Sequence, residues 1–381
     1  MTRRHVGLRR LESATRLAFG PPQEAVERLT ITNVKAWRLR EPDSGRRYTI
    51  VRLDSHGGVS GFGEGGTANA AEITEAKTAL IGCKATALEF VRHRLSSMPA
   101  LEAAFGNALT DLTARSVNVP IYQYLGGPTR FKTRLMARLP EVPTPSPDLL
   151  NHATGQGYRA FTLRVPPREP MSRLQAWVDF VGKRLADFKQ TAGADAEVVL
   201  DGGGVLLPGD AAVVARALET HHPIWFDEPT SVLTTDALSR ITDESVLPVG
   251  LGRGIHDIAG FQTLLRWGCA DVLRPSLGLN SVHKIRRIAA IAETHYIAVA
   301  PFHDGGPLAT MMGIHLAASL PNAYVQEVPI PASAKDRAMR AEILGGVPER
   351  AQDGFFTLVN QPGLGVRLEE QALNRYSEET L

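Results

Sequence analysis

Two aspartates and one arginine stand at matching places in the sequence. Asp201, Asp227 and Arg253 each follow a short apolar stretch, and successive members of the set lie 26 positions apart. That spacing suits one strand and one helix, and side chains at the ends of successive parallel strands point into one mouth. Two carboxylates there are typical of a divalent-cation site, whereas an arginine beside them repels a cation. The sequence leaves two interpretations open: Arg253 takes the place of a metal, or a weakened metal site persists with Arg253 turned outward.

The elements that would position these residues follow a repeated pattern of strand and helix from about residue 135. Parallel strands need helical crossovers of this kind, so the pattern predicts an α/β fold with a parallel (β/α)₈ barrel. An open doubly wound sheet is the structural alternative, although Gly202-Gly203-Gly204 lacks the spacing of a Gly-x-Gly-x-x-Gly phosphate loop. The eight expected strands cover 135–140, 160–165, 197–202, 223–228, 247–252, 270–275, 297–302 and 324–328.

The first part of the chain has a different pattern. Alternating apolar and polar residues with turn signals, followed by helical periodicity, predict an α+β domain over 29–130. We expect an N-terminal extension over 1–28 before it and the barrel over 131–342 after it. The segment 343–381 carries a turn and a short strand, and we expect it to return to the α+β domain.

Composition and charge are those of an ordinary globular protein. The formal net charge is +2 over 381 residues, and the dispersed basic residues predict no nucleic-acid partner. No apolar run approaches the roughly 20 residues that span a bilayer, so we expect no membrane association. Cys83 and Cys269 offer no disulfide framework, which is typical of a reducing compartment. We therefore predict a cytoplasmic protein.

Five segments in the right order give the chain a recognisable resemblance. From residue 29 to 381 the chain resembles the enolase superfamily, in the mandelate racemase and muconate lactonizing enzyme group. The segments are Gly61-Phe62-Gly63-Glu64, Ala108 to Gly127, Trp225-Phe226-Asp227-Glu228-Pro229, Ala300-Pro301 with Gly305-Gly306-Pro307, and Pro362-Gly363-Leu364-Gly365.

The resemblance implies a modified TIM-type (β/α)₈ barrel with an α+β capping domain that closes over its top. It implies a Mg²⁺ ion that three carboxylates hold and that binds a substrate carboxylate. A lysine or histidine then removes the neighbouring proton, and the metal stabilises the enediolate. The outcomes in such a family include racemisation, cycloisomerisation and loss of water from acid sugars. A symmetric homo-oligomer is expected as well.

Several positions depart from the family pattern. Asp201 and Asp227 match two metal ligands, but Arg253 stands at the third ligand position. The second barrel strand offers Thr162 and Arg164 where the family has two lysines. Threonine is not a base, and arginine stays protonated in proteins. Thr162, Arg164 and Arg253 are therefore predicted to bind substrate, and Arg164 is also a catalytic candidate; a salt bridge at the barrel mouth is the alternative role for Arg164.

Two further catalytic candidates lie late in the barrel. Phe302 occupies the place of the family's histidine base, and His303 follows it, while Ser276 stands where an orienting aspartate is expected. In a loop, His303 could still reach the pocket and act as a base near neutral pH; a solvent-facing or helix-capping role is the alternative. Glu327 matches an acid of the eighth strand, and its alternative role is to pair with Arg253 or Arg164.

Three hypotheses follow from the sequence. The first is an enolase-superfamily protein that binds a small, acid-sugar-like carboxylate at the barrel mouth, with altered or lost enolisation chemistry. The second is an active Mg²⁺-dependent acid-sugar dehydratase or racemase that uses His303 as base. The third is a non-catalytic binding or assembly subunit. Specificity is expected from the loops over 40–47 and 64–68.

Overall fold

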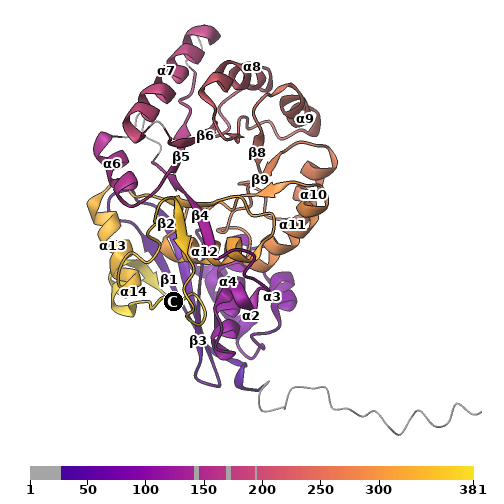
Figure 1. Cartoon of the computed structure of the whole chain (residues 1–381). Helices are drawn as coiled ribbons and strands as arrows, with labels where there is room; N and C mark the ends of the chain where they lie inside the picture. Colours follow the sequence, from indigo (N-terminus) through magenta and orange to yellow (C-terminus); the bar gives the residue numbers. More distant parts are fainter. Residues whose placement is uncertain (1–26, 141–145, 169–172, 194) are drawn as a thin grey trace, which may run out of the picture.

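The computed structural model describes residues 27–140, 146–168, 173–193 and 195–381. The extension predicted over 1–28 lies outside the described residues, apart from its last two positions. A small antiparallel sheet with its own helices sits at one end of a curled parallel sheet that helices surround (Figure 1). We call these two parts the cap and the barrel. In the described part of the chain, no helix is both long and apolar enough to cross a membrane.

The cap contains a four-stranded antiparallel sheet in the order β13-β1-β2-β3. Strand β13 comes from the end of the chain and pairs with β1 at Trp37, Arg38 and Leu39, so segments far apart in the sequence share this sheet. The strands are β1 (Ile31–Arg40), β2 (Arg47–Ser55), β3 (Ser60–Gly65) and β13 (Ser377–Thr380). The cap helices are α2 (Ala70–Leu80), α3 (Leu88–Arg94), α4 (Pro99–Ser116) and α5 (Ile121–Tyr124).

A stripe of glycines lets helix α4 lie directly on strand β3. Gly61, Gly63 and Gly65 alternate along the strand and therefore share one face. A Cβ atom at Gly63 would lie 2.1 Å from the carbonyl oxygen of Ala104 in α4, and the other two glycines face α4 backbone at 2.4 and 2.0 Å. The opposite face of β3 carries Glu64, which the same alternation turns toward the barrel.

The barrel consists of eight parallel strands in sequential order, with β11 beside β4 and a single bridge from Val299 to Ala323 near the closing edge. Each expected strand stretch overlaps one observed strand, so the predicted α/β fold with a (β/α)₈ barrel and an α+β cap is confirmed, and the doubly wound alternative is wrong. The strands are β4 (Lys132–Arg138), β5 (Ala160–Arg164), β6 (Glu197–Asp201), β7 (Phe226–Asp227), β8 (Val249–Leu251), β9 (Val272–Leu273), β10 (Ala298–Val299) and β11 (Gln326–Pro329).

Helices follow the barrel strands and cover their outer faces (Figure 1). Inside the barrel, one cluster of apolar side chains fills the lower layer, with Trp225 as its largest member. Short β12 (Phe355–Thr357) pairs antiparallel with β4. The helices after β4 are α6 (Pro147–Gly155), α7 (Leu174–Ala192), α8 (Pro208–Leu218), α9 (Thr235–Glu244), α10 (Ile258–Arg266), α11 (Val282–Thr294), α12 (Pro307–Ser319), α13 (Ala334–Leu344) and α14 (Glu370–Tyr376), with a 3₁₀ turn at η1 (Glu219–His221).

Candidate functional site

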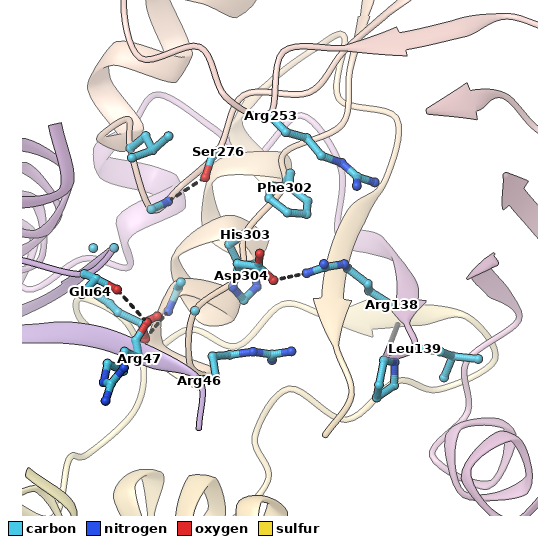
Figure 2. Close-up of a pocket in the computed structure, with 18 residues that line it drawn as sticks. Arg46, Arg47, Glu64, Arg138, Leu139, Arg253, Ser276, Phe302, His303 and Asp304 are labelled. Carbon is cyan, nitrogen blue, oxygen red and sulfur yellow. Dashed lines mark hydrogen bonds and ion pairs between the residues drawn. The ribbon is translucent and has the colours of Figure 1, made fainter. Parts of the chain in front are cut away.

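A cavity of about 630 Å³ lies between the cap and the barrel mouth (Figure 2). The cap contributes the end of the hairpin between β1 and β2 and the end of β3, which are the loops expected to set specificity. The barrel contributes the ends of several strands and the loop before α12. The lining residues are Arg46, Arg47, Glu64, Gly65, Gly66, Thr67, Arg138, Leu139, Pro140, Arg253, Ser276, Gly278, Leu279, Phe302, His303, Asp304, Gly305 and Ala309.

Strand geometry explains why charged groups gather above the apolar layer. Side chains alternate along a strand, so the residue two positions after an interior apolar residue also points inward. Val199 is followed in this way by Asp201, and Trp225 by Asp227. Arg164, Asp201 and Asp227 also pair in register across β5, β6 and β7, so their side chains stand side by side.

Arg253 bridges the two aspartates. Its Nη1 lies 2.9 Å from Asp201 Oδ2, and its Nη2 donates to Asp227 Oδ2. Burial alone would lower the pKa of Arg253, but Asp227 and Asp201 raise it well above its usual range. Burial likewise opposes ionisation of Asp201, yet Arg253 and then Arg164 hold the pKa of that carboxyl below its ordinary value. Arg253 and Asp201 are therefore both charged, and Arg253 contacts both aspartates.

This arrangement does not fit a Mg²⁺ ion. Magnesium requires hard oxygen ligands in near-octahedral geometry, whereas the two aspartates direct oxygens at guanidinium groups. Among the described residues, no group of three or more histidine, cysteine, aspartate or glutamate side chains could hold a metal ion. Glu228, next to Asp227, accepts from the backbone N–H groups of Gly252 and Arg253, both at 2.8 Å, and so fixes the segment that carries Arg253.

A second arginine, which the sequence analysis did not single out, completes the network. Arg274 is fully buried, and its Nε lies 3.0 Å from Asp227 Oδ2. Its Nη2 donates to Glu327, and its Nη1 donates to the carbonyl oxygen of Ala300 at 2.6 Å. Glu327 also lies 3.4 Å from Nε of Arg138. The partners of Glu327 are thus Arg274 and Arg138, in place of the Arg253 or Arg164 considered from the sequence.

The two predicted residues of the second barrel strand have different surroundings. Arg164 lies 3.2 Å from Asp201 Oδ1 and donates to the carbonyl oxygen of Gly203 at 3.3 Å. Gly203 has φ +54°, and a Cβ atom there would lie 1.6 Å from the guanidinium carbon of Arg164, so only glycine suits this contact. Thr162 is buried, and its hydroxyl has no hydrogen-bond partner within the described residues. Neither Thr162 nor Arg164 belongs to the described lining of the cavity.

His303 lines the cavity, as the loop interpretation requires. Its Nε2 lies 3.1 Å from the hydroxyl of Thr310, and its Nδ1 is buried without a partner among the described residues. Burial, followed by the charges of Arg340 and Arg46, lowers the pKa of His303 well below its usual range. The imidazole is therefore neutral at physiological pH, and it is a weaker proton acceptor than an ordinary histidine.

Phe302 takes the place of the expected histidine base and supports the arginines. The centre of its ring lies 4.5 Å from the guanidinium carbon of Arg253 and 4.9 Å from that of Arg138. A cation over an aromatic face is stabilised electrostatically. Ser276, at the position of the expected orienting aspartate, lines the cavity and accepts from the N–H of Gly278 at 3.2 Å (Figure 2).

Glu64 joins the cap to the barrel at the cavity wall. Its carboxylate accepts from the backbone N–H groups of Leu308 and Ala309, both at 3.1 Å, and from that of Gly306. These groups form the N-terminus of α12, where the helix dipole favours an anion. Burial nevertheless raises the pKa of Glu64 to about 7, against the effect of these donors.

Most of the residues predicted from the sequence lie close together at the barrel mouth. Asp201, Asp227, Arg253, Arg164 and Glu327 do form one network, while His303 lies at the cavity wall and Thr162 lies apart. Arg138 and Arg274 were missed, although each stands two positions after an interior residue, Met136 and Val272. Counting by two along each strand would have found both.

Residues 148–372 match the family described as "Enolase C-terminal domain-like". D-galactonate dehydratase of Klebsiella pneumoniae (strain 342) is 25% identical over 362 residues, which cover 90% of this chain and 93% of the relative. D-xylonate dehydratase of Haloferax volcanii is 24% identical, covering 96% and 93%. The crystal structure of an enolase from Agrobacterium radiobacter with bound Na and L-malate gives a TM-score of 0.81 at 23% identity, covering 91% and 95%.

Proposed function

Because the chain belongs to the enolase superfamily, in the mandelate racemase and muconate lactonizing enzyme group, we propose that its barrel mouth binds a small carboxylate of the acid-sugar type without a metal ion. The observation that carries this proposal is the contact of Arg253 with both Asp201 and Asp227. In this arrangement the guanidinium of Arg253 occupies the aspartate oxygens that a metal ion would need. Charge-assisted hydrogen bonds from guanidinium groups are well suited to carboxylates.

The same residues limit the chemistry that the site can perform. Thr162 and Arg164 cannot remove a proton from carbon at neutral pH, so enolisation is altered or lost. Any turnover would use His303 as a base or Glu327 as a hydrogen-bond donor. His303 is the better placed of the two because it lines the cavity, whereas both oxygens of Glu327 face arginines.

A second candidate function is a Mg²⁺-dependent acid-sugar dehydratase with His303 as base. It is supported by the relatives, because two dehydratases of sugar acids match almost the whole chain, and this similarity favours it over the metal-free function. It requires Arg253 to leave Asp201 and Asp227 and so expose their oxygens to the ion. A cytoplasmic location and a homo-oligomeric state remain predictions under both functions.

Calorimetry separates the two functions. Chelator-treated protein is titrated with Mg²⁺ and, separately, with D-galactonate, D-xylonate and L-malate in the presence of chelator. The metal-free function predicts carboxylate binding and no Mg²⁺ binding. In an Arg253→Glu variant, a third carboxylate replaces the repelling charge, and Mg²⁺ binding should appear.

Each other outcome is informative. Tight Mg²⁺ binding by the unmodified chain contradicts the metal-free function and supports the dehydratase. Failure of the Arg253→Glu variant to bind Mg²⁺ shows that residue 253 is not at the third ligand position. If neither Mg²⁺ nor any of the three carboxylates binds, the remaining hypothesis is a non-catalytic assembly role.

A further inference from the structure

Four arginines line the cavity, and the described structure gives ionic partners to three of them. Arg253 pairs with two aspartates, Arg138 pairs with Asp304, and Arg47 pairs with Glu378 at 3.1 Å. Arg46 has no ion-pair partner among the described residues, and its Nη1 is buried without a hydrogen bond. A buried donor without a partner carries a desolvation penalty that a bound acceptor would remove.

The carboxylates that act on Arg46 are already engaged elsewhere. Glu41 bonds to Arg340 at 2.6 Å, and Asp304 bonds to Arg138. Burial lowers the pKa of Arg46, and Arg340 lowers it further, while Glu41 and Asp304 only partly oppose this. This corner of the cavity therefore holds an excess of positive charge, which an anion would balance.

The hairpin that carries Arg46 is fixed to the barrel. Asp336 in α13 accepts from the backbone N–H groups of Asp43 and Ser44 at 2.8 and 2.9 Å. The Arg340–Glu41 pair ties the start of the same hairpin to α13. The backbone position of Arg46 is therefore set before any ligand arrives, which reduces the entropy lost on binding.

His303 offers a second donor next to Arg46. In Figure 2, Arg46 extends toward the space beneath His303 and Asp304, and Arg253 lies on the opposite side of them. When the hydroxyl of Thr310 donates to Nε2 of His303, the ring proton sits on Nδ1, the atom without a protein partner. That N–H is then a second donor at the cavity wall, and the charge of Arg46 acts on the same ring.

We propose that Arg46 of the cap hairpin, with the Nδ1–H of His303 beside it, anchors the carboxylate of the ligand. The inference rests on the proposed function and makes it more specific. The carboxylate would then bind on the cap side of the cavity and not beside Arg253, whose charge the two aspartates already neutralise. The cap then recognises the charged end of the ligand.

The test measures binding of D-galactonate, D-xylonate and L-malate by calorimetry in the presence of chelator. Arg46→Gln should weaken binding about 10- to 100-fold, because a hydrogen bond between charged groups is lost. Arg46→Lys should retain part of the affinity. The matched control is Arg40→Gln, on the same hairpin but outside the described cavity lining. Arg40 lies 3.5 Å from Glu378 in an exposed ion pair. The affinity of this variant for the carboxylates should stay within about twofold of that of the unmodified chain.

A fold defect can be told apart from a lost contact. Arg46→Gln removes a charge that Arg340 and Arg138 repel, so its thermal midpoint should equal or exceed that of the unmodified chain. Undiminished carboxylate binding by this variant overturns the assignment of Arg46 and leaves the proposed function intact. If the unmodified chain binds none of the three carboxylates, the proposed function is overturned, and the role of Arg46 with it.

Discussion

Replacing Arg274 with methionine should strongly destabilise the barrel. Arg274 is fully buried and donates to Asp227, Glu327 and the carbonyl oxygen of Ala300. Methionine fills the space of the side-chain stem but offers no donor. Removing one member of a buried ion pair costs about 3–5 kcal/mol, because the remaining charges lose their compensation. We expect about 3 kcal/mol, the lower end, since Asp227 keeps Arg253 and Glu327 keeps Arg138.

The assay is urea denaturation followed by circular dichroism, with Arg240→Met as the matched control. Arg240 is exposed and pairs with Glu244 one helical turn away, so its loss should cost less than about 0.5 kcal/mol. The double variant Arg274→Met, Glu327→Gln should recover about 1 kcal/mol or more, since it removes a buried carboxylate that lacks a full partner. A loss below about 1 kcal/mol for Arg274→Met, or an equal loss for the control, would refute the reasoning.

Two further predictions concern the cap. The pKa of Glu64 is raised to about 7 from 4.5, so its contribution to stability is complete below about pH 4.5 and is lost as the pH rises through 7. The free energy of unfolding should fall by up to about 3 kcal/mol over this range. The Glu64→Gln variant should lack this pH dependence in denaturation curves at pH 5 and 8. Gly63→Ala should destabilise the cap by about 2 kcal/mol or more in the same assay, because its Cβ would lie 2.1 Å from the carbonyl oxygen of Ala104. The control is Gly155→Ala, at a helical position with open space around it, which should be neutral or stabilising. An unchanged Gly63→Ala variant would contradict the close packing of β3 on α4.

The charged residues at the barrel mouth could be predicted where the sequence marks the end of a strand. Asp201, Asp227 and Arg253 end apolar stretches at a regular interval. Parallel register places Asp201 beside Asp227, whereas Arg253 lies beyond the end of β8 and reaches both aspartates with its side chain. The same reasoning applies to Arg138 and Arg274, which could have been predicted by counting two residues past an interior position. The ion pair between Arg274 and Glu327 could not be predicted, because it depends on distances across the barrel.

The role of Arg46 could not be predicted from its neighbours in sequence. It stands in a polar hairpin with other arginines, and Arg40, Arg46 and Arg47 have equivalent surroundings in the sequence. Arg46 and Arg47 both line the cavity, but Arg47 and Arg40 pair with Glu378. These positions depend on the packing of the hairpin against α13, which the sequence does not reveal. Likewise, the burial of His303 depends on the loop before α12, which no periodic pattern describes.

The pairing of β1 with β13 has a consequence for how the molecule is made. Arg38 in β1 bonds to Glu379 in β13, 341 positions later. During synthesis, β1 leaves the ribosome first, and its outer edge stays unpaired until nearly all of the barrel has followed. An open strand edge is a place where other chains can add. For most of its translation, the nascent protein therefore exposes an edge that its own last residues must protect.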